Sequence, residues 1–359
     1  MSSEFGKNIK VSVFGESHGE AIGVVINGLP VGESIDFEKL QEFMERRRGG
    51  KNAFSTKRSE KDVPRFLSGV LDNKTCGMPL TAIIENGDKR SGDYSEILDK
   101  PRPGHADYTA FLKWGGMADM RGGGHFSGRL TAPLCVAGGI AKQILERRGI
   151  YVGAHISEIH GIKDISFPEY PSSELFEDIA QKPFPVIDDE KGASMMADIT
   201  LAASDGDSVG GIVECVAVGL PAGLGSPMFD GVENKMASAL FGIPAVKGVE
   251  FGRGFEAARL KGSENNDPYE IRDGKIRTVS NNAGGILGGI TNGEPLRVRT
   301  AFKPTPSIAK EQKTVSLSKL ENTTLVIKGR HDPCIVQRAV PVVEAVVALV
   351  ILDMLCEGE

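Results

Sequence analysis

The sequence has few aromatic residues, no excess of positive charge and no long hydrophobic run. One Trp and five Tyr among 359 residues are too few for the aromatic platforms on which single-stranded nucleic acids stack. The net charge of −6 gives no general attraction to nucleic acid or anionic lipid. The most apolar segment, residues 345–352, is too short to span a bilayer, and the N-terminus lacks the apolar core of a signal peptide. We therefore expect a soluble cytoplasmic protein without nucleic-acid or membrane partners.

Cysteine pairs are also absent. The five cysteines include no CxxC motif, so we expect neither a disulfide framework nor a zinc site, but small buried apolar side chains in a reducing compartment. Hydrophobic residues make up 40% of the chain, which is enough for a sizeable core. Because the net charge is negative, any site for an anion must be local.

Two glycine-rich segments, residues 101–108 and 121–131, carry the residue types of such a site. They contain Arg102, His105 and Arg129 among closely spaced glycines. Glycine lets the backbone approach a ligand closely, arginine matches phosphate or carboxylate with a fixed fork of donors, and histidine moves protons near neutral pH. The combination predicts an anion-binding catalytic pocket.

This glycine loop is not a known nucleotide motif. Gly123 and Gly128 have the spacing of a P-loop, but Arg129 and Leu130 stand where that motif needs Lys and Ser or Thr. The loop does not match GxGxxG either. A helix is predicted to begin directly after it, and the free N–H groups of a helix N-terminus favour phosphate.

Other predicted turns repeat the same residue types, and each has an ordinary structural alternative. Ser17 and His18 follow a predicted strand and could form a simple hairpin turn. Residues 303–307, Lys-Pro-Thr-Pro-Ser, suit a phosphate or an ordinary polar loop. Asp332 could accept a proton or cap the following helix. Residues 46–48, three arginines at a predicted helix end, could bind an anion or complement the helix dipole.

Periodicity predicts a chain of mixed α and β structure. The expected strands are residues 10–14, 22–26, 66–70, 80–84, 212–218, 246–251 and 296–302, and the expected main helices are residues 36–48, 131–148, 234–241 and 335–355. A turn at Asp72 and Asn73 is expected to separate two of the strands. Residues 167–192, rich in Pro, Glu and Asp, are expected to form an exposed excursion, and residues 262–274 a mobile loop. We expect one domain, residues 1–359.

Six motifs stand in the order and spacing of one family: residues 14–19, 102–108, 122–131, 280–289, 303–307 and 329–344. In this respect the chain resembles chorismate synthase over nearly its whole length. The resemblance implies an α+β fold, a sandwich of helices between antiparallel sheets, assembled as a homotetramer with a deep basic pocket.

The resemblance also implies an activity. The expected reaction is a 1,4-anti elimination of phosphate from 5-enolpyruvylshikimate 3-phosphate, which gives chorismate at the end of the shikimate pathway. It needs reduced FMN without net redox change, because the flavin is thought to lend an electron and then recover it. NADPH is a candidate source of the reducing equivalents.

Site residues follow from the resemblance by position. The residues expected to be catalytic are His18, His105, Asp332 and Ser17. His18 corresponds to the histidine proposed to protonate the leaving phosphate, His105 to the one proposed to protonate reduced flavin, and Asp332 to the acid assigned to proton removal at the flavin. The arginines expected to hold the substrate are Arg47, Arg102, Arg129 and Arg330. The residues expected on flavin-binding segments are Ser127, Ala245, Gly288, Lys303, Thr305, Ser307 and Arg330.

The chain departs from the family pattern in three places. Residues 125–131 lack one Arg, one Ser and a Glu, Ala53 replaces an arginine, and Pro306 replaces a Ser. These changes motivate an alternative, a divergent flavin- or phosphate-binding protein without lyase activity. No dinucleotide fingerprint supports a third possibility, a flavin reductase.

Overall fold

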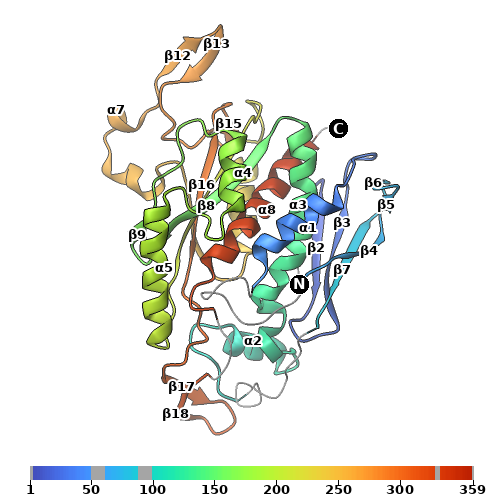
Figure 1. Ribbon diagram of the computed structural model, residues 1–359, viewed down its shortest axis with the longest axis vertical. Helices are drawn as coiled ribbons and strands as arrows, with labels where there is room; N and C mark the ends of the chain where they lie inside the picture. Colours follow the sequence, from blue (N-terminus) through green and yellow to red (C-terminus); the bar gives the residue numbers. More distant parts are fainter. Residues whose placement is uncertain (1–2, 50–60, 88–98, 328–331, 358–359) are drawn as a thin grey trace.

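The computed structural model describes residues 3–49, 61–87, 99–327 and 332–357. Its core consists of two five-stranded antiparallel sheets with helices packed between them (Figure 1). The mixed α and β architecture expected from the sequence, with helices between antiparallel sheets, is confirmed.

The first sheet has the strand order β1-β2-β3-β7-β4. Its strands are β1 Glu4–Phe5, β2 Lys10–Gly15, β3 Ala21–Asn27, β7 Leu80–Glu85 and β4 Arg65–Ser68. In β3 the alternate residues Ile22, Val24 and Ile26 are buried, as the period of two in a strand predicts. They face the helical layer, and this fixes the register of the sheet.

The second sheet has the order β11-β16-β10-β8-β9. Its strands are β11 Val246–Phe251, β16 Leu296–Phe302, β10 Gly211–Val218, β8 Tyr151–Ile159 and β9 Ile162–Lys163. The central strand β10 pairs with β16 on one side and with β8 on the other. Residues 303–307 follow the end of β16 directly and lie at the candidate site.

Four helices form the layer between the sheets: α1 Phe37–Arg47, α3 Thr131–Arg147, α6 Val232–Phe241 and α8 Val336–Leu355. Helices α3 and α8 approach closely at Gly138, where an added Cβ would lie 2.2 Å from the Cβ of Ala345. Larger residues there would force the helices apart. Pro341 lies inside α8, which continues through it. The close α3–α8 contact fixes the ends of both helices at the site.

Residues 167–192 do not form an exposed excursion, and this prediction is wrong. They contain α4 Ser173–Gln181 and the start of α5 Asp189–Ser204. The ring of Phe176 packs on Gly153 of β8, and Phe167 is buried beside it. Apolar residues at helical spacing bury one face of α4, while the acidic residues that suggested an excursion occupy its other face.

Two further predictions need correction. The turn at Asp72 and Asn73 closes a small hairpin, β5 Val70–Leu71 and β6 Lys74–Thr75, rather than joining the main strands. Residues 262–274 are not one loop, since they include α7 Gly262–Asn265 and β12 Tyr269–Arg272, which pairs with β13 Lys275–Thr278. This hairpin projects from the body of the molecule (Figure 1).

The remaining elements are short. They are α2 Asp107–Trp114 and the hairpins β14 Ile286–Leu287 with β15 Ile290–Thr291 and β17 Gln312–Ser316 with β18 Glu321–Leu325. All five cysteines are free thiols, and three of them are buried. Within the described ranges, no helix combines the length and the apolar character that a membrane crossing requires.

Candidate active site

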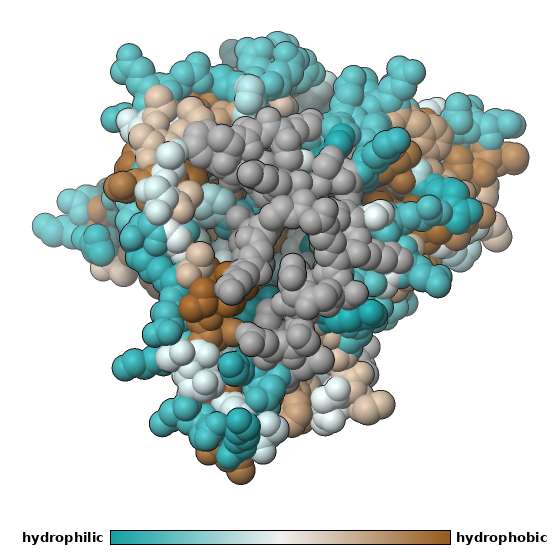
Figure 2. Space-filling model, turned by 60° about the horizontal axis from the view of Figure 1, so that its bottom comes forward, coloured by the Kyte–Doolittle hydropathy of each residue, from teal (hydrophilic) through white to brown (hydrophobic). Residues whose placement is uncertain are grey.

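A cavity of about 1120 Å³ opens where strand ends and helix starts from separate parts of the chain meet. It is lined by segments of the β2–β3 turn, the end of α1, the loops before α2 and α3, the α6–β11 turn, the end of β16 and the start of α8. On the face drawn in Figure 2, hydrophilic side chains dominate the described surface, with apolar patches between them.

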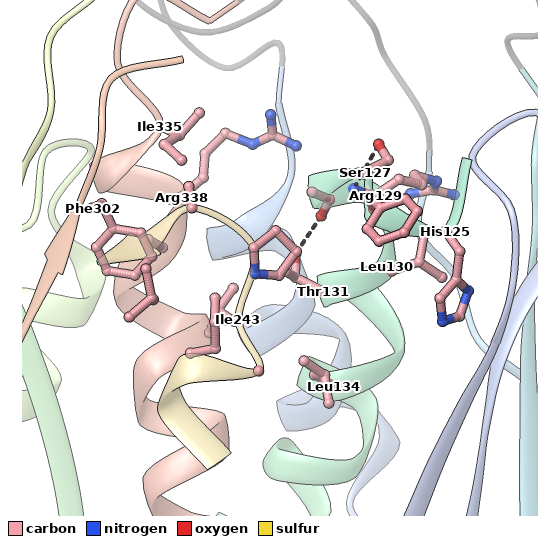
Figure 3. Close-up of a pocket in the computed structure, with 18 of the residues that line it drawn as sticks. His125, Ser127, Arg129, Leu130, Thr131, Leu134, Ile243, Phe302, Ile335 and Arg338 are labelled. Atoms are coloured by element: carbon pink, nitrogen blue, oxygen red, sulfur yellow. Dashed lines mark hydrogen bonds between the residues drawn. The ribbon is translucent and has the colours of Figure 1, made fainter. Parts of the chain in front are cut away.

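Apolar and polar side chains line both sides of the cavity (Figure 3). Ile243, Phe302 and Ile335 lie on one side with Arg338, whereas His125, Ser127 and Arg129 lie on the other with Leu130 and Leu134. Such a cavity suits a ligand with a flat apolar part and charged groups at its edge.

The glycine-rich loop is built around the position of His18. Gly122, Gly123 and Gly124 have φ angles of 61°, 91° and 54° within η2 Arg121–Phe126, a left-handed region that other residues rarely adopt. A Cβ on Gly122 would lie 2.1 Å from Nδ1 and Cε1 of His18. The loop can therefore pack directly on the imidazole because it lacks side chains there.

His18 is buried at the end of the β2–β3 turn and lines the cavity. Asn86 secures this turn, because its Nδ2 donates hydrogen bonds to the carbonyls of Glu16 and Gly19 at 3.1 and 3.0 Å. Ser17 is fully buried and donates its backbone N–H to Gly124 at 3.1 Å. Ser17 does not itself line the cavity.

His105 is held by a buried ion pair. Nδ1 of His105 donates to Oδ1 of Asp107 at 2.7 Å, and Arg102 contacts the same carboxylate through Nε and Nη2, both at 2.7 Å. Burial would raise the pKa of Asp107, but hydrogen bonds from Arg102 and His105 outweigh it and hold the pKa well below its usual range. Arg102 Nη1 also donates to the hydroxyl of Ser307 at 3.3 Å.

Arg47 and Arg129 are joined through Asp62. Arg47 Nη2 donates to Oδ2 of Asp62 at 3.0 Å, and Arg129 Nη1 donates to Oδ1 of the same carboxylate. Burial lowers the pKa of Arg47 to about 10 despite the opposing charge of Asp62, so this guanidinium stays charged at neutral pH. Arg129 Nε also contacts Asn86 Oδ1 at 3.1 Å, and Arg47 Nη1 contacts Thr131 Oγ1 at 3.0 Å.

At the start of α8, Arg338 connects Asp332 to this group. Its Nη1 donates to Oδ2 of Asp332 at 2.6 Å, and its Nε donates to the backbone carbonyl of Arg47 at 2.9 Å. All three residues line the cavity. Arg330 and Ala53 lie outside the described residues.

Most of the residues predicted to bind flavin line the same cavity. Ser127, Ala245, Lys303, Thr305 and Ser307 all line it. The backbone N–H of Lys303 donates to the carbonyl of Ala245 at 3.0 Å, and its Nζ donates to the carbonyl of Gly104. Burial, followed by the charge of Lys247, lowers the pKa of Lys303.

Gly288 lies in the turn of the β14–β15 hairpin and does not line the cavity of this chain. Its φ is 62°, and an added Cβ would meet open space. Among the described residues, no cluster of three or more His, Cys, Asp or Glu side chains could hold a metal ion.

Sequence reasoning assigned no role to four residues that organise the site: Asp62, Asn86, Asp107 and Arg338. Asp107 stands inside the Arg-Pro-Gly-His-Ala-Asp motif, two residues after His105, so its spacing was a usable signal. For Asp62 and Asn86 the partners come from distant segments, and nothing local marks them.

Comparison with known proteins agrees with this geometry. Residues 9–356 match the family model for chorismate synthase. A chorismate synthase of Thermococcus kodakarensis is 51% identical over 352 residues, covering 98% of this chain and 96% of that protein. One of Dehalococcoides mccartyi is 48% identical over 354 residues, covering 99% and 96%. A crystal structure of chorismate synthase aligns with a TM-score of 0.78 at 29% identity, covering 98% of this chain and 93% of that one. Sequence and fold agree along almost the whole length, and the chain belongs to the chorismate synthase family.

Proposed function

We propose that this protein is a carbon–oxygen lyase that converts 5-enolpyruvylshikimate 3-phosphate to chorismate with reduced FMN. In this 1,4-anti elimination the C–O bond to phosphate breaks, a hydrogen leaves C6 and a C=C bond forms, with no net redox change. The observation that carries the proposal is the convergence of Arg47, Arg102 and Arg129 with His18 and His105 on one cavity. The substrate has one phosphate and two carboxylates, which several buried guanidinium groups can neutralise.

The residues present suit a flavin bound beside the substrate. The cavity volume of about 1120 Å³ exceeds the roughly 300–1000 Å³ of most single-ligand pockets. Thr305 Oγ1 is buried with no hydrogen-bond partner among the described residues, so it has a hydrogen bond to offer a ligand. Ser127, Ala245, Lys303, Thr305 and Ser307 would hold FMN, and Ile243, Phe302 and Ile335 offer an apolar surface for its ring (Figure 3). Arg330 and Gly288 are proposed from the family pattern.

When bound, reduced FMN supplies an electron-rich ring that assists departure of phosphate. The protein's own part is to move protons and hold anions. An imidazole nitrogen of His18 gives a proton to the leaving phosphate, with Ser17 fixing the turn that carries it. His105 holds its transferable proton on Nε2, because Nδ1 is engaged by Asp107. The carboxylate of Asp332 accepts a proton, and Arg338 orients that carboxylate.

Four guanidinium groups are proposed to bind the substrate: Arg47, Arg102, Arg129 and Arg330. The differences from the family pattern at residues 125–131 remove none of these four arginines. Arg129 keeps its place at the start of α3, and Ser127 caps η3 Gly128–Leu130 by accepting the N–H of Arg129 at 3.3 Å. The loop therefore retains the groups that the proposal requires.

The protein is further proposed to be a single-domain, cytoplasmic homotetramer. Its single domain is supported by the helical layer shared by both sheets (Figure 1). Uncovered apolar side chains support assembly: Phe14 on the first sheet is 39% exposed, and Ile271 and Ile276 on the projecting hairpin are 73% and 70% exposed. Ile271 and Ile276 are cross-strand partners, and contiguous exposed apolar surface marks contacts between proteins. NADPH is proposed as a candidate reductant for the flavin.

Anaerobic turnover tests the function. Protein with chemically reduced FMN and 5-enolpyruvylshikimate 3-phosphate is expected to release chorismate and phosphate in equal amounts. Product formation should fall sharply in His18→Ala and His105→Ala. Tight flavin binding that survives both substitutions, with no turnover by the unmodified protein, would instead identify a binding protein without lyase activity. NADPH oxidation with added FMN checks the reductase activity separately, and sedimentation checks the tetramer.

A further inference from the structure

Asp62 is a buried charge that no proton transfer or ligand contact in the proposed function uses. It is only 3% exposed and lines the cavity. Its φ of 47° lies in the left-handed region, which aspartate tolerates better than most residues. A charged side chain is rarely fully buried unless it is paired, so its partners explain its position.

Both carboxylate oxygens of Asp62 are used by arginines that face the same cavity. Oδ2 accepts from Arg47 Nη2 at 3.0 Å and Oδ1 accepts from Arg129 Nη1. One planar carboxylate therefore bridges two guanidinium groups from different helices and sets the distance between them. Among the described residues, Arg47 Nη1 also donates to Thr131 Oγ1 and to the carbonyl of Gly128, and Arg129 Nε donates to Asn86 Oδ1.

The charges around Asp62 show why such a bridge is needed. Burial lowers the pKa of Arg47, and the charges of Arg338 and Arg129 lower it further, whereas the charge of Asp62 raises it. Burial would raise the pKa of Asp62, but Arg47 and then Arg129 outweigh burial and lower it. Without the carboxylate, the two guanidinium groups would repel each other across a buried space.

We propose that Asp62 is a positioning residue that holds Arg47 and Arg129 as one preorganised pair for an anionic group of the substrate. The proposal deepens the proposed function and rests on it for the identity of the substrate. Preorganised donors bind an anion without first paying the cost of ordering two long side chains. The two arginines together with Asp62 retain one net positive charge, which suits a carboxylate or phosphate oxygen approaching from the cavity.

An opposite role for Asp62 makes an opposite prediction. If its carboxylate merely occupied the anion site until substrate displaced it, removing the negative charge would tighten substrate binding. If it positions the arginines, Asp62→Asn loosens binding even though the cavity becomes more positive. The sign of the change in affinity therefore separates the two roles.

The test measures binding of 5-enolpyruvylshikimate 3-phosphate by calorimetry, together with KM and kcat, in the full-length protein. We expect Asp62→Asn to raise the dissociation constant and KM by about tenfold or more, since misplaced binding groups cost factors of this size. Glu256→Gln, which breaks an exposed pair with Arg253 on the surface, is the matched control and should change neither value. Unchanged or tighter binding in Asp62→Asn would overturn the proposal.

A second variant distinguishes loss of the carboxylate from misfolding of the protein. Asp62→Gly suits the left-handed φ and leaves a space into which formate fits. Added formate is expected to restore part of the lost affinity in this variant and to leave the unmodified protein unchanged or slightly inhibited. A folded Asp62→Gly protein that formate does not rescue would contradict the positioning role. If the unmodified protein does not bind the substrate at all, the proposed function is wrong. The arginine pair is then tested separately: binding of inorganic phosphate is measured by calorimetry in the unmodified protein and in Asp62→Gly, with and without formate.

Discussion

Asp107 accepts a hydrogen bond from Nδ1 of His105 at 2.7 Å while the guanidinium of Arg102 holds the same carboxylate. A carboxylate only accepts, so the hydrogen must be on Nδ1 and the Nε2 atom is the one left to exchange protons. Arg102 Nη2 also lies 3.0 Å from Nδ1, but a protonated Nδ1 cannot accept from it. The ion pair thus sets the tautomer of the histidine.

Asp107→Asn is expected to lower kcat by about 10²-fold, the lower range of what acid–base catalysis contributes, and also to raise KM, because Asp107 holds Arg102. An amide can donate as well as accept a hydrogen bond, so it no longer dictates the tautomer of His105. Anaerobic turnover with chemically reduced FMN, measured across pH, checks the prediction. Asp198→Asn is the control, because Asp198 forms an equivalent pair with the exposed His160 at 2.9 Å. Equal losses in the two variants would contradict a role for Asp107 at the site.

Arg338 spans two groups that a shorter cation could not reach together. It contacts Asp332 Oδ2 at 2.6 Å and the carbonyl of Arg47 at 2.9 Å through different nitrogens of one rigid fork. Arg338→Lys is expected to keep the charge but lose one contact, and to lower kcat/KM by about 10-fold to 10²-fold. Steady-state kinetics of Arg338→Lys and Arg338→Met check this. A lysine variant with full activity would show that charge alone matters at this position.

Elements with strong periodicity were predictable from the sequence. The alternation in β3 and the apolar stripe of α1 correspond directly to buried faces, because burial of a whole face leaves a repeating signal. The prediction for residues 167–192 was wrong because this segment has no such clear repeating signal. The acidic residues of α4 lie on its solvent side and the prolines lie outside this helix. The composition of the segment therefore concealed its buried positions, among them Phe176 and Ile179.

The site was predictable only where chemistry lies within one motif. The segments with His18, His105 and Arg129 each carry glycine beside a functional residue, and the structure brings them to one cavity. Asp62 could not be found in this way, because it lies 15 residues from Arg47 and 67 from Arg129. A bridge between distant residues depends on how the helices pack, and that packing leaves no local pattern in the sequence.

Glu344 gives the stability of the helical layer a defined dependence on pH. Its carboxylate contacts Arg46 at 2.6 and 2.9 Å and Lys142 at 2.7 Å. Burial would raise the pKa of Glu344, but these two cations lower it to about 2. A depressed pKa contributes stability above the ordinary pKa of about 4.5, and the contribution disappears as the pH falls towards about 2.

Glu344→Gln is therefore expected to lower the free energy of unfolding by roughly 3 kcal/mol at neutral pH, as loss of one partner of a buried ion pair does. The difference between the two proteins should shrink as the pH falls from about 4.5 to about 2, because both then carry a neutral side chain. Urea unfolding at several pH values measures it. A difference that stays constant over this range would show that packing, not charge, is responsible.

Gly122 is the position where a single added methyl group should displace the ring of His18. Its Cβ would lie 2.1 Å from two atoms of His18, far inside van der Waals contact. Its φ of 61° adds backbone strain for any other residue. The effect of backbone strain must be separated from the effect of the steric clash with His18. Gly115 serves as the control, because it has a φ of 58° but nothing within 4 Å of an added Cβ.

Gly122→Ala is expected to lower kcat by about 10²-fold, since the His18 ring must move by an ångström or more from its productive place. Gly115→Ala carries the same backbone strain, which costs roughly 1 kcal/mol, and should lower the melting temperature slightly while leaving kcat unchanged. Turnover and thermal unfolding of both variants check the pair. If Gly122→Ala lost stability but kept its kcat, the loop could adapt to the methyl group, and the contact with His18 would not govern the proton transfer assigned to it.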